Sequence, residues 1–244
     1  PDDYFSFYGE LSYQMYMMKD WPYMILTDGN SHNLALNFRL MRSSIDNPIY
    51  TRRGSQFTLG LKITPPYSLI KGTTDAQYAQ MSATEKYNLL EYHKWSFSGK
   101  VFTPLTADSK LVLMARADFG YLGHYNKNVK SPFESFYMGG DGMSSYSSYS
   151  TEYISMRGYQ SGSLTPYDPA TGRNMGYVYN KFTMELRYPI ALEQNATIWA
   201  LAFLEAGNCF ADIKDYNPFN LKRSAGVGVR LFLPMFGLMG IDWG

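Results

Sequence analysis

The sequence is short of the residues that build disulfides and metal sites. Its one cysteine, Cys209, excludes an intramolecular disulfide and any metal site made of paired cysteines. Its three histidines, His32, His93 and His124, are too far apart for the short spacing that places two imidazoles on one face of a helix. We therefore expect no metal ion and no other cofactor.

Long hydrophobic runs and an excess of one charge are absent as well. No stretch of about 18 consecutive apolar residues occurs, and the mean hydropathy is −0.30, which together exclude a membrane-spanning helix. The chain has 22 Lys and Arg against 21 Asp and Glu, a net charge of +1. Because nucleic acids attract strongly basic surfaces, we expect no nucleic-acid partner.

Patterns typical of enzymes are also missing. The sequence has no Gly-x-Ser-x-Gly motif and no glycine-rich phosphate loop between a strand and a helix. The serines of residues 144–148 favour a flexible linker over a nucleophile. Asp212, Asp215 and Asn217 offer oxygen ligands of the kind that calcium prefers, but an ordinary solvated loop is the favoured interpretation. We expect a protein that is not an enzyme.

The sequence is instead rich in aromatic residues and in alternating strands. Aromatic residues make up 17% of the chain, with 22 Tyr and 15 Phe, which fits the aromatic girdles of a membrane β-barrel. The clearest strand alternates Phe182, Met184 and Leu186 with Thr183 and Glu185. Such strands have about 10 residues, the length with which a tilted strand crosses a bilayer. We predict strands over residues 5–15, 33–40, 56–63, 94–101, 111–119, 181–188, 197–206 and 224–231, and a ninth that begins near residue 238.

The predicted strand over residues 197–206 departs from the alternation of polar and apolar residues. One of its faces is small, with Ala200 and Ala202, whereas the other carries the bulky Trp199 and Phe203. The pattern alone therefore does not assign the inward face of this strand.

The connections alternate between short and long, as in outer-membrane barrels with tight periplasmic turns and long external loops. Short turns are expected at residues 104–109, 189–195 and 234–237, and long loops at residues 65–91, 123–174 and 207–221. The turn over residues 43–54 falls on the periplasmic side and is longer than this pattern predicts. No helix is expected beyond one short helical turn in residues 84–92. The sequence thus predicts an all-β fold, a transmembrane antiparallel β-barrel of which this chain supplies about nine strands, with the loop over residues 123–174 plugging the lumen.

The long loop contains two short motifs. They are Phe136-Tyr137-Met138-Gly139-Gly140 and Met156-Arg157-Gly158-Tyr159. Both resemble motifs in the sixth extracellular loop of the BamA family, the assembly proteins of the bacterial outer membrane. The family has valine where this chain has Met156, which is a mild apolar exchange.

The resemblance extends over most of the chain past residue 33. It includes residues 50–55, 184–189, 203–208 and 223–230. It implies that residues 1–244 form the C-terminal part of a barrel of about 16 strands. Periplasmic repeat domains and the first strands would precede this part, and the final strand would follow it.

A loop folded back into the lumen would bring Arg157 to the barrel wall. A buried guanidinium needs partners, because a desolvated charge without them is costly. Glu185 lies on the polar face of its predicted strand, and Glu205 is the only charged residue in its own. We predict that Arg157 pairs with these two acids in bidentate fashion, that Gly158 permits close backbone approach, and that Tyr159 stacks on or hydrogen-bonds to the wall. The alternative is an exposed loop arginine and two unrelated acids.

The resemblance also implies a function. It implies the central barrel subunit of a complex that folds and inserts β-barrel proteins into the bacterial outer membrane without ATP. The partners implied are nascent outer-membrane proteins, accessory assembly lipoproteins, periplasmic chaperones and the lipid bilayer. Three alternatives stay open: a related translocation, assembly or two-partner secretion transporter, a passive outer-membrane porin, and a soluble β-sandwich binding module.

Overall fold

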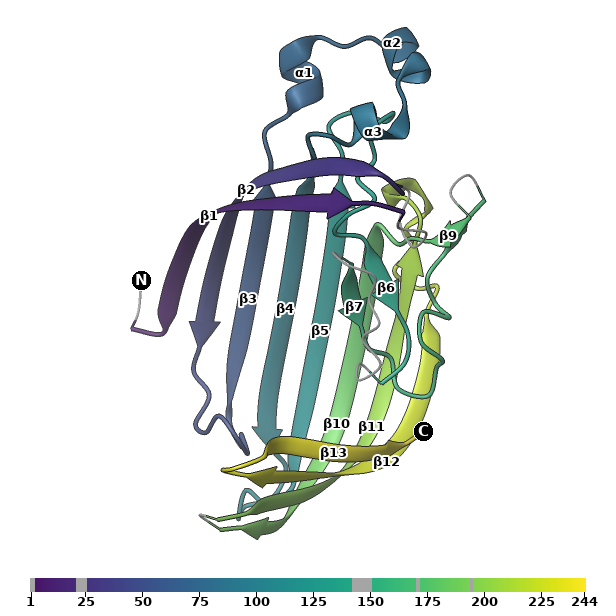
Figure 1. The fold of residues 1–244 in the computed structure, drawn as a ribbon. Helices are drawn as coiled ribbons and strands as arrows, with labels where there is room; N and C mark the ends of the chain where they lie inside the picture. Colours follow the sequence, from purple (N-terminus) through teal and green to yellow (C-terminus); the bar gives the residue numbers. More distant parts are fainter. Residues whose placement is uncertain (1–2, 21–25, 142–150, 170–171, 194) are drawn as a thin grey trace.

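The computed structural model describes residues 3–20, 26–141, 151–169, 172–193 and 195–244. Nine long antiparallel strands form one curved sheet in the order β1-β2-β3-β4-β5-β10-β11-β12-β13 (Figure 1). Their bounds are β1 (Phe5–Met18), β2 (Gly29–Ser43), β3 (Gly54–Ile63), β4 (His93–Pro104), β5 (Val112–Gly123), β10 (Val178–Leu192), β11 (Thr197–Phe210), β12 (Lys222–Leu233) and β13 (Gly237–Trp243). The predicted strands are all present, and several run further into the loops than the alternation alone suggested.

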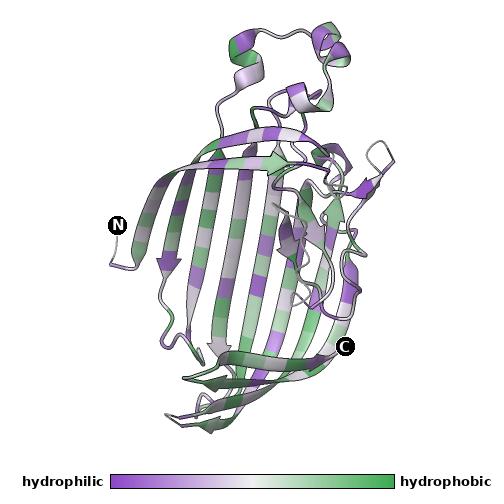
Figure 2. Ribbon diagram, in the orientation of Figure 1, coloured by the Kyte–Doolittle hydropathy of each residue, from purple (hydrophilic) through white to green (hydrophobic). Residues whose placement is uncertain are grey.

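The two faces of the sheet differ in the way that the alternation predicts. Leu59, Met184 and Leu204 point outward and are exposed, whereas Thr183 and Glu185 point inward and are buried. Figure 2 shows the resulting alternation of hydrophobic and hydrophilic bands along the strands. An apolar outer face and a polar inner face are typical of a strand wall that meets lipid outside and a polar lumen inside.

Strand β11 is the exception, and the structure assigns its faces. The bulky residues Trp199, Leu201 and Phe203 point inward and are buried, while the small residues point outward. The inner face of β11 is therefore apolar from Trp199 to Phe203, and Glu205 follows on the same face. The apolar part is covered by Tyr50, which reaches it from the turn between β2 and β3.

Two of the three short helices were not expected from the sequence. Helices α1 (Tyr67–Lys71), α2 (Asp75–Gln80) and α3 (Ala83–Lys86) lie in the connection between β3 and β4, and a 3-10 turn, η1 (Ile213–Asp215), follows β11. Only α3 overlaps the helical turn predicted for residues 84–92. The others are too short to give a helical period, but Thr74 and Ser82 form capping boxes with Gln77 and Glu85 that mark where α2 and α3 begin. None of the helices in the described ranges is long and apolar enough to span a membrane.

Candidate functional site

The long connection between β5 and β10 folds back against the inner face of the sheet (Figure 1). Its described part contains two small ladders, a parallel pair of β6 (Phe136–Met138) with β7 (Glu152–Ile154) and an antiparallel pair of β8 (Tyr167–Asp168) with β9 (Arg173–Asn174). The connection is therefore more ordered than the structureless loop expected over residues 123–174. The serine-rich residues 144–148 lie outside the described residues.

Apolar side chains hold this loop against the wall. Phe136, Met138 and Met156 are fully buried in a cluster that includes Tyr179 of β10 and Cys209 of β11. The ring of Phe136 meets that of Tyr179 edge-on, with 4.7 Å between centroids. The mild change from valine to Met156 thus places a flexible apolar side chain in a site that is completely shielded from solvent.

The structure brings Arg157 to both of the acids named from the sequence. Its Nη2 lies 2.8 Å from Glu185 Oε1 and 2.8 Å from Glu205 Oε1, and its Nε lies 3.0 Å from the same Glu205 oxygen. The backbone N–H of Arg157 donates to the other oxygen, Glu205 Oε2, at 2.8 Å. A bidentate pair in which two N–H groups of the guanidinium meet two oxygens of one carboxylate is therefore not what the structure shows. One oxygen of the Glu205 carboxylate accepts two N–H groups of the guanidinium, and its other oxygen accepts the backbone N–H of Arg157.

Four further residues belong to this site and were not singled out from the sequence. Lys181 Nζ lies 3.0 Å from Glu205, Arg187 Nη2 lies 2.6 Å from Glu185, and Asp242 Oδ2 lies 3.8 Å from Arg157 Nη1. The fourth is Phe203, since the guanidinium of Arg157 lies over its ring, 3.8 Å from the centroid. Lys181 and Arg187 share the polar face of β10 with Glu185, so the alternation held a signal for both. Phe203 and Asp242 depend on the path of the loop and on the pairing of β13, which the alternation does not report.

The electrostatics favour a permanently charged arginine. Only 10% of the Arg157 side chain and 2% of the Glu205 side chain are exposed. Burial alone would lower the pKa of Arg157, but the hydrogen bond and charge of Glu205, with help from Glu185, outweigh burial and raise that pKa. The two inward acids on neighbouring strands are thus neutralised by Arg157 from the loop together with Lys181 and Arg187 of β10.

The glycine and tyrosine of the second motif seat the loop against β12. Gly158 has a φ of 80°, a conformation that side chains disfavour, and an added Cβ would lie 3.2 Å from Ser224 Cβ. The Tyr159 hydroxyl donates to the backbone oxygen of Arg223 at 2.9 Å. The close approach and the wall contact expected for these two residues are both present in the structure.

The first motif makes the loop's internal contacts. Tyr137 packs beside Tyr153, with 5.8 Å between ring centroids, across the β6–β7 pair. Gly139 has a φ of 126° and accepts a hydrogen bond from the Tyr153 hydroxyl at its carbonyl oxygen. The next residue, Gly140, accepts from the backbone N–H of Met156 at 2.8 Å, which ties the two motifs directly together.

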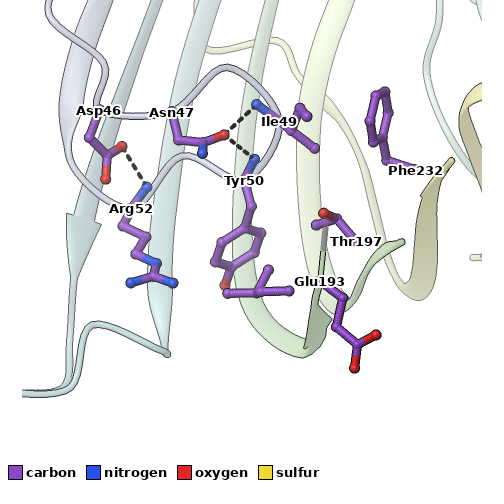
Figure 3. A pocket seen from close by; sticks show the side chains of 9 residues that line it. Asp46, Asn47, Ile49, Tyr50, Arg52, Glu193, Thr197 and Phe232 are labelled. Carbon is purple, nitrogen blue, oxygen red and sulfur yellow. Dashed lines mark hydrogen bonds between the residues drawn. The ribbon is translucent and has the colours of Figure 1, made fainter. Parts of the chain in front are cut away.

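At the opposite end of the sheet, the turn over residues 44–53 places a tyrosine in the lumen (Figure 3). Asn47 Oδ1 accepts from the backbone N–H groups of Ile49 and Tyr50, and Asp46 Oδ1 accepts from that of Arg52. Figure 3 shows how these bonds order the turn beside a cavity that Phe232 also lines. The turn is longer than expected because it is an ordered segment that carries Tyr50 into the lumen.

Tyr50 is held on both its ring and its hydroxyl. It is 3% exposed, its ring meets Trp199 at 5.6 Å between centroids, and its hydroxyl lies 3.0 Å from Lys110 O and 3.4 Å from Arg187 O. Burial raises the pKa of this hydroxyl to about 12, so it stays protonated and donates at neutral pH.

Asp212, one of the residues considered for calcium, has other contacts. Asp212 Oδ2 lies 2.6 Å from Lys130 Nζ and its Oδ1 accepts from the backbone N–H of Lys214. Among the described residues, no group of three or more His, Cys, Asp and Glu side chains is arranged to hold a metal ion.

A curved antiparallel wall with apolar side chains outside, charged ones inside and a loop folded onto the inner face defines a protein of the outer-membrane β-barrel class. The chain belongs to the Omp85 superfamily, because the model of the Omp85 superfamily domain matches residues 2–244. This family and this fold point to the bacterial outer membrane.

Among solved structures, the chain is similar to the crystal structure of BamA from Haemophilus ducreyi lacking POTRA domains 1-3. The TM-score is 0.65 at 16% sequence identity, and the match covers 99% of this chain and 48% of that one. The likeness shows a BamA-like fold, and the chain spans about half the length of that structure. A search of curated protein sequences finds no match to the chain.

Proposed function

We propose that this chain is part of an outer-membrane assembly factor that folds and inserts β-barrel proteins, as the central barrel subunit of an assembly complex. Membership of the Omp85 superfamily and the BamA-like fold support the proposal. The single observation that carries it is the placement of Arg157 against Glu185 and Glu205 on the inner wall, which fixes the motif that resembles the BamA family inside the curved sheet.

The proposed mechanism needs no covalent chemistry. A barrel whose first and last strands pair weakly opens sideways and offers a strand edge to an incoming chain. The backbone groups of the new strand then pair with that edge in place of water. A locally thinned bilayer beside the opening lowers the cost of insertion. No catalytic residue, cofactor or ATP takes part in these steps.

The clients follow from this mechanism, and the chaperones and lipoproteins from the resemblance to the BamA family. Nascent outer-membrane proteins are the clients, periplasmic chaperones deliver them unfolded, and accessory lipoproteins complete the complex. The apolar outer face, with residues such as Leu59 and Met184, contacts the bilayer in which the protein is embedded.

The proposal is tested with the full-length protein reconstituted in phospholipid vesicles. A urea-denatured eight-stranded outer-membrane protein is added, and its insertion is followed by its resistance to protease. We expect insertion at least about tenfold faster than in empty vesicles, equivalent to about 1.4 kcal/mol off the barrier. An equal rate would contradict the proposal.

The same vesicles separate the other functions. A porin would give steady ion conductance with no effect on client insertion. A secretion transporter would move a soluble client across the vesicle wall and leave the denatured barrel protein uninserted. Either result without client insertion would contradict the assembly function and indicate the porin or the transporter instead.

A further inference from the structure

A second cluster of charges lies between the loop and strands β3 and β4. Glu134 Oε1 lies 2.5 Å from Lys62 Nζ, and Glu134 Oε2 lies 3.0 Å from Lys94 Nζ. Glu152 of β7 also reaches Lys94, at 2.8 Å. The loop therefore carries acids at one part of its path and Arg157 at another, each facing the opposite charge on the wall.

The two lysines are a costly pair without the loop. Lys62 and Lys94 are directly opposite each other in the register of β3 and β4, and both extend inward. Like charges directly opposite each other on neighbouring strands are destabilising. One carboxylate that contacts both ammonium groups, one oxygen each, removes this repulsion.

Glu134 is well placed to be that carboxylate. Its side chain is 16% exposed and that of Lys94 is 8% exposed. Burial would raise the pKa of Glu134, but the Lys94 and Lys62 ammonium groups lower it below its ordinary value, so the carboxylate stays charged. Its backbone has a φ of 69°, which is uncommon for a residue other than glycine and persists where the surroundings hold it.

The Glu134 and Arg157 ends of the loop are mechanically connected. Glu134 precedes β6 by two residues, and Arg157 follows β7 by three. Strands β6 and β7 pair with each other in parallel, and the bond from Gly139 N to Ile154 O, 3.0 Å long, continues the connection. A shift at Glu134 is therefore passed to Arg157 through a short hydrogen-bonded ladder.

We propose that Glu134 is a second anchor of the loop, and that by bridging Lys62 and Lys94 it positions the loop so that Arg157 reaches its two acids. The wall offers a lysine pair on one side and an acid pair on the other. The loop carries the complementary charges in matching order, so only one orientation of the loop satisfies both pairs. Glu134 is a positioning residue in this account, since it acts on Arg157 through β6 and β7.

The test is hydrogen–deuterium exchange on the full-length protein in detergent micelles, read by mass spectrometry. Glu134→Gln keeps the shape of the side chain and removes its charge. We expect exchange over residues 152–158 to become about tenfold faster, because one partner of a largely buried charge cluster is lost. Strands β10 and β11 should exchange as in the wild type. Unchanged exchange over residues 152–158 would overturn the proposal.

Glu152→Gln is the matched control, because it removes a second acid from the same Lys94. The Glu152 side chain is 41% exposed, so we expect less than about a twofold change. If Glu152→Gln loosened the loop as much as Glu134→Gln does, the anchor would not be specific to Glu134.

A double-mutant cycle with Lys62→Gln tests the same bridge from the lysine side. Lys62→Gln removes the lysine repulsion, so Glu134→Gln should have a smaller effect in that background than alone. If the fold-changes in exchange rate of the two single variants simply multiply in the double variant, the two residues do not act through a shared bridge. This proposal rests on the proposed function for the importance of the loop, but exchange is read without any client. Loop docking and client assembly therefore succeed or fail separately.

Discussion

At the scale of single residues, the two acids that hold Arg157 are unequal. Glu205 accepts from the backbone N–H, Nε and Nη2 of Arg157 and also lies 3.0 Å from Lys181. Glu185 accepts one bond from Arg157 and has a second cation, Arg187, on its other oxygen. Loss of Glu205 would leave two buried cations under-neutralised, whereas Glu185 is shared with a neighbour on its own strand.

We predict that Glu205→Gln destabilises the protein more than Glu185→Gln. Removing the central partner of a buried charge cluster costs about 3–5 kcal/mol. The loss at Glu185 should lie nearer the about 1.5–3 kcal/mol of a charged hydrogen bond, because Arg157 loses only one bond there and keeps Glu205. Urea unfolding of the full-length protein in micelles, followed by tryptophan fluorescence, measures both variants. Equal losses in the free energy of unfolding would contradict this prediction, because the two acids would then contribute equally to stability.

These residues also show what could be predicted from the sequence. Glu185 could be predicted because period-2 alternation places it on the polar face of its strand, and Glu205 because it is the only charged residue of its strand. The motif supplied Arg157. The roles of Glu134, Phe203 and Asp242 could not be predicted, because their contacts depend on how the loop crosses the lumen. Alternation describes each strand by itself and contains no information on such long-range contacts.

At the scale of elements, the turn over residues 44–53 and strand β11 explain each other. The strand has an apolar inner face at Trp199, Leu201 and Phe203, whereas the inner face of a barrel strand is typically polar. The turn supplies Tyr50 to cover it. A sequence reading that treats turns as simple connections misses such an element, and it also misses short helices such as α2, whose only signal is a capping box.

We predict that Tyr50→Ala and Tyr50→Phe have clearly different effects. Tyr50→Ala removes a fully packed ring and should cost about 3–5 kcal/mol, by analogy with other buried aromatic truncations. Tyr50→Phe keeps the ring and loses only the hydroxyl bonds, a loss of about 1–2 kcal/mol. Thermal unfolding of both variants in micelles tests this, and similar midpoints would mean that the ring does not stabilise the β11 face.

At the scale of the whole molecule, the sheet separates two environments. Charged clusters occupy the inner face, and exposed apolar side chains occupy the outer face of the long strands. The loop joins the strands around the lumen, with Glu134 at β3 and β4 and Arg157 at β10 and β11. In the proposed function this connection keeps the wall in shape while a client is inserted beside it.

We predict opposite tolerance to charge on the two faces of one strand. Leu59 points outward and is 47% exposed, and its neighbour Thr58 points inward. Leu59→Arg should cost about 2–4 kcal/mol in lipid and reduce insertion of the full-length protein into vesicles. Thr58→Arg should insert nearly as the wild type does. Equal insertion of the two variants would contradict a lipid-facing outer surface.

The most direct test of the account is tryptic cleavage of the full-length protein embedded in vesicles, because Arg157 is itself a trypsin site. The Lys127 side chain in the same connection is 72% exposed, whereas that of Arg157 is 10% exposed. Mass spectrometry of the fragments should find the bond after Lys127 cut and the bond after Arg157 intact. Cleavage of both bonds at the same rate would show that the loop is not anchored on the inner wall.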